Sequence, residues 1–355
     1  MRWQTTEQIA TIPMRSIGPL KIKGPEVEAE LLIPLATFET PLWPSTHRGA
    51  RTCTQAGGIN AVIIDDRMTR SVLLEAENAT DAYEAVLNLQ QHKEAMQTII
   101  AETSRYARLV DMHIQVVGTL IFVRFEFNTG DAAGHNMSTL AADRLLEWIL
   151  VRFKTLKYVS ISGNYCTDKK VSAVNGILGR GKYVIAEVNI PFELCQKQLK
   201  STPEQIVQLN IKKNLIGNII AGGIRTANAH FANMLLGFYL ATGQDAANII
   251  EGSQGLTYAE VRGRDLYFSV TLPNVIVGAV GNGKTFDFVR ENLRMLGCLE
   301  EREVGKNARR LAVIAASAVL CGELSLLASQ TNPGELIKSH LKLERGKSSE
   351  GQQRG

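Results

Sequence analysis

The segment LVDMHIQVVGTLIFVRFEF, residues 109–127, consists of two apolar runs that meet at Gly118-Thr119. Both runs are rich in β-branched and aromatic residues, which favour extended backbone. A glycine between two such runs is typical of a short turn. Residues 109–117 and 120–127 therefore predict two antiparallel strands joined in a hairpin.

The residues on either side of this hairpin repeat one pattern. Upstream, residues 71–76 are strand-like, and residues 80–103 carry apolar side chains at roughly helical spacing. Downstream, residues 138–153 read as a helix and residues 158–161 as a last strand. The order β-α-β-β-α-β is that of a split βαβ, ferredoxin-like sandwich. We therefore expect residues 71–160 to form a small domain of their own.

The flanking residues 1–70 and 161–330 are then one discontinuous large domain of helices and sheet, which gives an α+β fold class. Small side chains in its last helix would let that helix pack closely among other elements, so we expect a central core helix and not a membrane span. Residues 331–355 are expected to form a C-terminal flap that carries His340, followed by a disordered tail. The helices predicted in the large domain cover residues 203–209, 228–242, 287–295 and 306–328.

The composition limits the class of protein and of partner. Of the 355 residues, 45% are apolar and 21% are charged, as in an ordinary soluble globular protein. Lys and Arg together number 39, against 35 for Asp and Glu. This small excess of positive charge is too weak for a nucleic-acid-binding surface, but it is compatible with a small anionic ligand. Five cysteines without paired spacing favour a reducing compartment over a disulfide framework or a zinc site. The N-terminus lacks the apolar stretch of a signal peptide. We expect a cytoplasmic protein without metal, nucleic-acid or membrane partners.

Four short segments carry candidate catalytic groups. Residues 162–170, Ser-Gly-Asn-Tyr-Cys-Thr-Asp-Lys-Lys, place an acid and two bases side by side in a turn. Glu39 ends an apolar stretch, Asp245 stands in Gly-Gln-Asp-Ala-Ala, and His340 follows Lys-Ser near the C-terminus. Taken singly, each has an ordinary structural explanation; Asp245, for example, could only cap the helix that follows it. Together these segments offer a Glu, a Lys, an Asp and a His.

In these contexts the chain resembles 3-hydroxy-3-methylglutaryl-coenzyme A reductase, over most of residues 17–345. The resemblance implies a soluble, four-electron reduction of hydroxymethylglutaryl-coenzyme A (HMG-CoA) to mevalonate and coenzyme A. It implies NADPH as the hydride donor, with NADH as an alternative, and a homodimer or larger assembly with active sites between subunits. The motifs look more like the eukaryote-type (class I) enzymes. Further matching stretches are residues 17–20, 68–70, 130–137 and 228–233.

The resemblance also implies a role for each candidate residue. Lys169 would stabilise the oxyanion, Glu39 would deliver a proton, Asp245 would hold both in a hydrogen-bonded network, and His340 would protonate the departing thiolate. Coenzyme A would contact Ser45 and Arg48. The hydroxymethylglutaryl group would be bound by Arg70, Ser162, Asp168, Lys170, Lys213 and Asn233. The nicotinamide cofactor would be bound by Asp131, Gly134, Asn136, Gly281, Gly283, Lys284 and Arg345.

Two alternatives remain open at this point. Residues 278–285, Gly-Ala-Val-Gly-Asn-Gly-Lys-Thr, satisfy the P-loop pattern and would make the chain a nucleotide hydrolase. The residues that follow offer no strand-terminal Asp for magnesium, which weighs against that function. Lys284 is then a departure from the reductase pattern and a candidate partner for a 2′-phosphate. The other alternative is a non-catalytic relative that binds acyl-coenzyme A.

Overall fold

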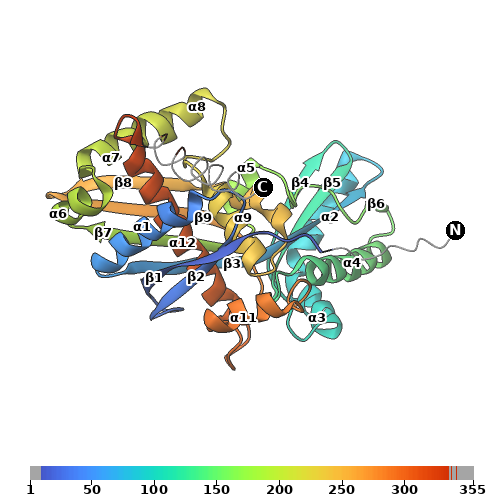
Figure 1. Ribbon diagram of the computed structural model, residues 1–355. Helices are drawn as coiled ribbons and strands as arrows, with labels where there is room; N and C mark the ends of the chain where they lie inside the picture. Colours follow the sequence, from blue (N-terminus) through green and yellow to red (C-terminus); the bar gives the residue numbers. More distant parts are fainter. Residues whose placement is uncertain (1–8, 336, 338–340, 342–355) are drawn as a thin grey trace, which may run out of the picture.

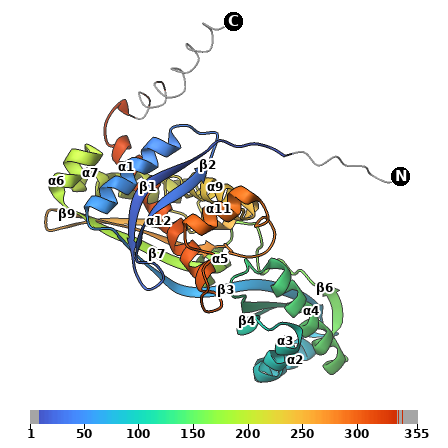
Figure 2. The same ribbon diagram turned by 60° about the horizontal axis from the view of Figure 1, so that its bottom comes forward.

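The computed structural model describes residues 9–335, 337 and 341 (Figures 1 and 2). These residues form a mixed α/β fold, in agreement with the coarse class that the sequence predicts. His340, Arg345 and most of the expected C-terminal flap lie outside the described residues.

The larger part of the fold is built on a mixed sheet with the strand order β2-β1-β3-β7-β9-β8. β1 and β3 pair in parallel, whereas the other neighbours are antiparallel. The sheet carries a core of buried apolar side chains to which helices α1, α9 and α12 contribute. The strands are β1 (Met14–Lys23), β2 (Ala29–Ala36), β3 (Ile59–Glu75), β7 (Gly181–Ile190), β8 (Leu256–Arg262) and β9 (Asp265–Val275).

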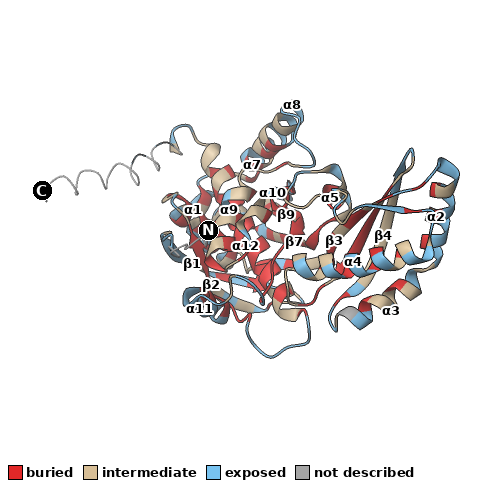
Figure 3. Cartoon of the chain, turned by 90° about the vertical axis from the view of Figure 1, so that its right-hand side faces the viewer, coloured by how far each residue is buried: buried red, intermediate tan, exposed pale blue. Residues whose placement is uncertain are grey.

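Strand β3 leaves this sheet and continues into a second set of strands, ordered β4-β5-β3-β6. Helices α2, α3 and α4 belong to this part, which has a separate hydrophobic cluster (Figure 3). The predicted hairpin is present. The first predicted strand, residues 71–76, is wrong in extent, because β3 begins at Ile59 and pairs with strands of both sets. The elements are α2 (Ala79–Gln91), α3 (Lys93–Thr103), β4 (Arg108–Val117), β5 (Leu120–Asn128), α4 (His135–Arg152) and β6 (Lys157–Ser160).

The predicted helix over residues 80–103 is two helices. The chain leaves helical geometry at His92, which has φ −104° and ψ 20°. Its Nδ1 lies 2.6 Å from the carbonyl oxygen of Asn88, so the His92 side chain hydrogen-bonds this backbone carbonyl at the end of α2. A continuous apolar stripe does not reveal such a break, because both helices contribute buried side chains to one hydrophobic cluster.

Helix α12 (Lys306–Gln330) is the central helix that the sequence predicts. It packs against β3, β7 and β9, with α1 (Leu42–Gln55) and α9 (Phe231–Ala241) beside it. Its length and apolar composition would allow a membrane span, but 94% of its most apolar window is buried inside the protein. The backbones of α1 and α12 approach so closely that a Cβ on Gly49 would lie 2.0 Å from the Cys321 carbonyl oxygen. The burial is that of a core helix.

The remaining helices surround the sheet and carry the loops of the site. α9 begins at Phe231 and not at the predicted residue 228. The Asn228 side chain accepts the N–H of Phe231, and the buried Glu323 accepts the N–H groups of Ala229 and His230. These side-chain contacts bind the backbone of residues 229–231 at the start of the helix. The others are α5 (Ala173–Leu178), α6 (Phe192–Leu194), α7 (Pro203–Leu209), α8 (Asn218–Ile220), α10 (Ile249–Gly252) and α11 (Asp287–Met295).

Candidate active site

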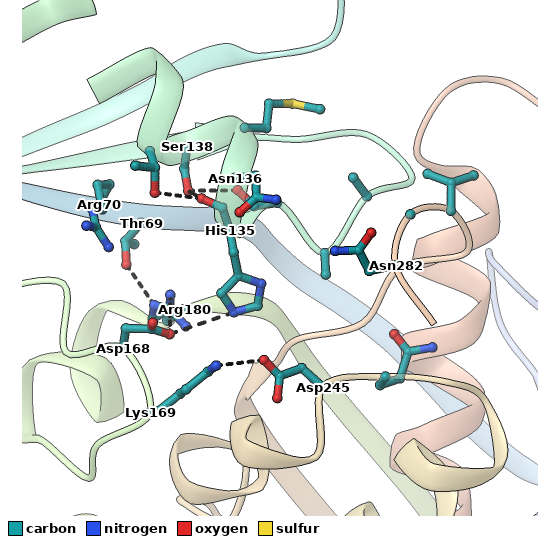
Figure 4. A pocket seen from close by; sticks show the side chains of 18 of the residues that line it. Thr69, Arg70, His135, Asn136, Ser138, Asp168, Lys169, Arg180, Asp245 and Asn282 are labelled. Carbon is teal, nitrogen blue, oxygen red and sulfur yellow. Dashed lines mark hydrogen bonds and ion pairs between the residues drawn. The ribbon is translucent and has the colours of Figure 1, made fainter. Parts of the chain in front are cut away.

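A cavity of about 620 Å³ lies where several segments meet, and Figure 4 shows its side chains. The lining comes from residues 69–70 of β3, residues 132–139 at the start of α4, the turn at 168–169, Arg180, the loop at 244–245 and the glycine-containing loop at 280–284. The cavity is therefore lined by at least one residue predicted to bind the cofactor, one predicted to bind the substrate and one predicted to stabilise the oxyanion. The predicted residues that line it are Arg70, Gly134, Asn136, Asp168, Lys169, Asp245, Gly281 and Lys284.

Lys169 and Asp245 form an ion pair at this cavity, with Nζ 2.7 Å from Oδ2. Partial burial alone would raise the pKa of Asp245, but the hydrogen bonds from Lys169 and from the Ala247 N–H, together with the nearby positive charge, lower it. The same contact raises the pKa of Lys169. Asp245 also caps the short helix after it, because Oδ1 accepts the Ala247 N–H at 3.1 Å. Its structural and its proposed chemical role use different oxygens.

The turn that carries Lys169 has an unusual backbone. Asn164, Thr167 and Lys169 have φ values of 58°, 45° and 53°, in the left-handed region that favours glycine. Such conformations persist only where the surroundings hold them, and they occur often at functional sites. Asn175 donates to the Thr167 carbonyl at 3.0 Å, and the Lys169 N–H donates to Glu251 at 3.1 Å.

Asp168 belongs to a charged cluster beneath the same turn. The buried Arg180 places Nη2 2.9 Å from Asp168 Oδ1 and donates through Nη1 to Glu251 at 2.8 Å. The first contact is a close ionic one without hydrogen-bond alignment, because Oδ1 has no hydrogen-bond partner among the described residues. Burial raises the pKa of Glu251, although Arg180 acts in the opposite direction.

His135 also reaches this cluster, from the first turn of α4. Its Nε2 lies 3.7 Å from Asp168 Oδ1 and has no hydrogen-bond partner among the described residues (Figure 4). Burial and the positive charge of Arg180 lower the pKa of His135 despite the nearby carboxylates, which favours the neutral ring.

Sequence reasoning missed His135, Arg180 and Glu251. His135 lies inside the quoted stretch 130–137, so its place beside the cofactor loop was visible. A buried Arg180 between two glycines, and a Glu251 after two isoleucines, carry no motif that signals an ion pair.

The residues of the loop at 131–136, predicted to bind the cofactor, differ in their positions and contacts. Gly134, at φ 96°, begins α4, and Asn136 lies in the first turn. Asp131 does not line the cavity. Its two carboxylate oxygens accept the N–H groups of Gly305 and Ala308 at 2.8 and 2.9 Å, so Asp131 caps α12. That contact favours a role in holding the loop in place over direct contact with a ligand.

The loop at residues 281–284 packs against the Asp245 loop. A Cβ on Gly283 would lie 2.5 Å from the Gly243 carbonyl oxygen, so only glycine fits this approach. The Lys284 ammonium donates to that same carbonyl. Burial lowers the pKa of Lys284 to about 8. The helix after this loop begins only at Asp287, whereas a P-loop lysine stands where its helix begins, so the geometry does not support the P-loop alternative.

Glu39 makes its side-chain contact away from the Lys169 pair. Its Oε2 accepts the side-chain N–H of Asn233 at 2.9 Å, which joins two of the predicted residues. Among the described residues, Glu39 makes no hydrogen bond or ion pair with Lys169 or Asp245, and it does not line the cavity. The described part of the chain pairs two of the predicted catalytic residues, Lys169 and Asp245, and joins a third, Glu39, to the predicted substrate residue Asn233.

The other predicted substrate residues make separate contacts. Ser45 and Arg48 both contact Ser325 of α12, and burial lowers the pKa of Arg48. Burial also lowers the pKa of Lys213, whose amine donates to Asn214. The remaining contacts are Lys170 to the Asp168 carbonyl, Arg70 to the Ile161 carbonyl, and Ser162, through its backbone, to Ser160.

Comparison with known proteins places this geometry in a family. The model of the family "Hydroxymethylglutaryl-coenzyme A reductase" matches residues 8–345. The 3-hydroxy-3-methylglutaryl-coenzyme A reductase of Aeropyrum pernix is 43% identical over 337 residues, which cover 94% of this chain and 80% of the relative. That of Pyrococcus abyssi is 44% identical over 324 residues, which cover 90% and 79%.

A solved structure shows a similar fold. It is the class II 3-hydroxy-3-methylglutaryl-CoA reductase from Streptococcus pneumoniae, bound to NADPH in open conformations. The TM-score is 0.73, and the match covers 93% of this chain and 87% of that chain. At 18% identity, the likeness is one of fold.

Proposed function

This chain belongs to the hydroxymethylglutaryl-coenzyme A reductase family, and from that premise we propose that it reduces HMG-CoA to mevalonate and free coenzyme A with NADPH. The observation that carries the assignment is the Lys169–Asp245 ion pair at one cavity with the first turn of α4. Oxidation of NADPH that depends on HMG-CoA, measured with the purified protein, tests it. Binding of HMG-CoA without oxidation would favour the non-catalytic acyl-coenzyme A binder.

The Lys169 ammonium supplies the positive charge that the reaction needs. Attack of hydride on the thioester carbonyl, and later on the aldehyde, leaves negative charge on one oxygen. A cation held before the reaction stabilises that charge at little cost in reorganisation. Asp245 orients the amine toward the cavity and keeps it protonated, because the ion pair raises the Lys169 pKa.

Proton transfer is the task of two further residues. We assign to Glu39 the donation of a proton to the reduced oxygen, with Asn233 orienting its carboxyl group at 2.9 Å. Coenzyme A departs more readily when an acid protonates its thiolate, and we assign that proton to His340. Since Glu39 is separate from Lys169 within one chain, we infer that a homodimer or larger assembly completes the site.

The residues at the cavity fit a phosphorylated dinucleotide. The first turn of α4 offers backbone N–H groups and a positive helix end, both of which favour phosphate. Arg70 and Lys284 add positive charge, and a Cβ on Gly281 would meet no atom within 4 Å. NADPH, when bound, supplies the hydride. Asn136 and Gly134 would lie along the cofactor, and Asp131 would hold their loop through its cap on α12.

Lys284 and Arg345 are the proposed readers of the 2′-phosphate, and the structure makes the Lys284 prediction dependent on pH. A group with a pKa near 8 loses its charge as the pH rises through that value. The preference for NADPH over NADH should therefore be about tenfold stronger at pH 7 than at pH 9. In Lys284→Met the preference should be weak at both values. Dissociation constants for both cofactors measure this, and equal losses for NADPH and NADH would exclude phosphate recognition by Lys284.

We further propose that residues 71–160 form the inserted, ferredoxin-like cofactor domain. The strand order β4-β5-β3-β6 and the separate hydrophobic cluster support this. The large domain would comprise residues 1–70 and 161–330, with 331–355 as the flap. We also propose that the enzyme is cytoplasmic. We further propose that it belongs to the eukaryote-type class, which is consistent with its identity of only 18% to a class II enzyme.

A further inference from the structure

One carboxylate oxygen gathers the hydrogen bonds beneath the Lys169 turn. Glu251 Oε1 accepts the backbone N–H of Lys169 at 3.1 Å, Nη1 of Arg180 at 2.8 Å and Nδ2 of Asn248 at 3.0 Å. The other oxygen, Oε2, is buried and has no hydrogen-bond partner among the described residues. Glu251 is itself completely buried. One atom therefore joins the Lys169 backbone to both Arg180 and Asn248.

The same short segment of chain holds Lys169 at both of its ends. Asp245 binds the amine at 2.7 Å, and Glu251, six residues later, binds the backbone N–H. Asp245 caps a 3₁₀ turn at residues 246–248 that is followed directly by α10, so a continuous helical segment sets the spacing between the two carboxylates. With both ends fixed, the direction of the Lys169 side chain is fixed as well.

Lys169 needs this support because its backbone is strained. A lysine at φ 53° is stable only where its surroundings hold it, and a chain freed from that restraint relaxes to negative φ. Such a change at the α-carbon would move the amine, at the end of four carbons, away from Asp245.

We propose that Glu251 is a positioning residue for Lys169, which holds the strained turn through Oε1 so that the amine faces the reacting oxygen. This inference rests on the proposed function, in which Lys169 stabilises the oxyanion. Glu251 touches neither substrate nor cofactor in this account, and Arg180 supports it by fixing the carboxylate.

Two conservative variants separate positioning from simple charge balance. Glu251→Gln keeps the length of the side chain, so its amide oxygen can accept the same three donors while its NH₂ takes the place of the unpartnered Oε2. Glu251→Asp keeps the charge beside Arg180 but withdraws the oxygen by one methylene. If Glu251 acts by positioning, the Gln variant should be the more active of the two. If it acts only by balancing the charge of Arg180, the Asp variant should be the more active, since the Gln variant leaves a buried arginine unpaired, which is costly.

The experiment measures kcat and KM for HMG-CoA in both variants and in Lys169→Ala. We expect Glu251→Asp to lose about tenfold to 10²-fold in kcat, as for a displacement of about 1 Å at a catalytic group, with a smaller change in KM. Glu251→Gln should stay within a few-fold of the parent. Glu26→Asp is the matched control, because Glu26 is also a buried carboxylate on an arginine, Arg309, at 2.6 Å, but contacts no part of the turn.

Each outcome decides one question. A lower kcat in Glu251→Gln than in Glu251→Asp overturns positioning, as does a parental kcat in Glu251→Asp. If Glu251→Asp does not fold, Arg180→Lys replaces it, because a lysine keeps the charge but cannot bridge Glu251 and Asp168; a parental kcat there also overturns the proposal. If Lys169→Ala retains turnover, the proposed function of Lys169 fails first, and this inference fails with it.

Discussion

Replacing Lys169 by alanine should lower the turnover of HMG-CoA by at least about 10²-fold, the usual cost of losing one oxyanion donor. The effect should be equally large for added mevaldehyde, because both hydride transfers place negative charge on the same oxygen. Thermal unfolding should change little, since the Lys169 and Asp245 side chains are 38% and 46% exposed and a pair so exposed contributes little to stability. Steady-state rates on both substrates measure the loss.

Lys93→Ala provides the matched control for this variant. Lys93 forms an ion pair with Asp111 at 3.2 Å, and the two side chains are 49% and 46% exposed, close to the values for the Lys169 pair. Its removal should leave turnover at the parental value. Near-parental turnover of folded Lys169→Ala would refute the oxyanion role.

Replacing Asp245 by asparagine should have an effect of similar size, about 10²-fold in kcat, because the amine loses the group that aims it. Asparagine keeps an oxygen that can accept the Ala247 N–H, so the helix cap survives and the fold should be intact. The variant thus separates the charge of Asp245 from its capping role. Asp111→Asn, which breaks the exposed Lys93 pair, is the control.

The same variant should shift the pH profile in one direction. The contact with Asp245 raises the Lys169 pKa, so the ammonium is present below that pKa and is lost as the pH rises through it. Without the carboxylate the pKa falls, and the alkaline limb of residual kcat should move to lower pH. An unchanged alkaline limb would mean that the cation in question is not Lys169.

Local patterns in the sequence were sufficient to predict much of the fold. The hairpin at residues 109–127 and the central helix α12 follow from apolar periodicity, which reports burial within a single element. Lys169 and Asp245 could be named because each stands in a short context that resembles the reductase family, and the structure brings them to 2.7 Å.

Other features depend on contacts between distant segments, which periodicity does not record. β3 reads as a short strand from residue 71, yet it extends from Ile59, because two different sets of partner strands pair with its halves. The Asp131 cap on α12 joins residues far apart in the chain. Arg180 and Glu251 become visible only when the turn at Lys169 is placed above them.

The most direct test of the account is the ratio of NADPH oxidised to coenzyme A thiol released, with HMG-CoA as the limiting substrate. Reduction of a thioester to an alcohol consumes two hydrides, and only the first reduction releases the thiol. We expect two equivalents of NADPH for each thiol, with mevalonate as the product. One equivalent for each thiol, with the aldehyde accumulating, or no HMG-CoA-dependent oxidation by the folded protein, would contradict it.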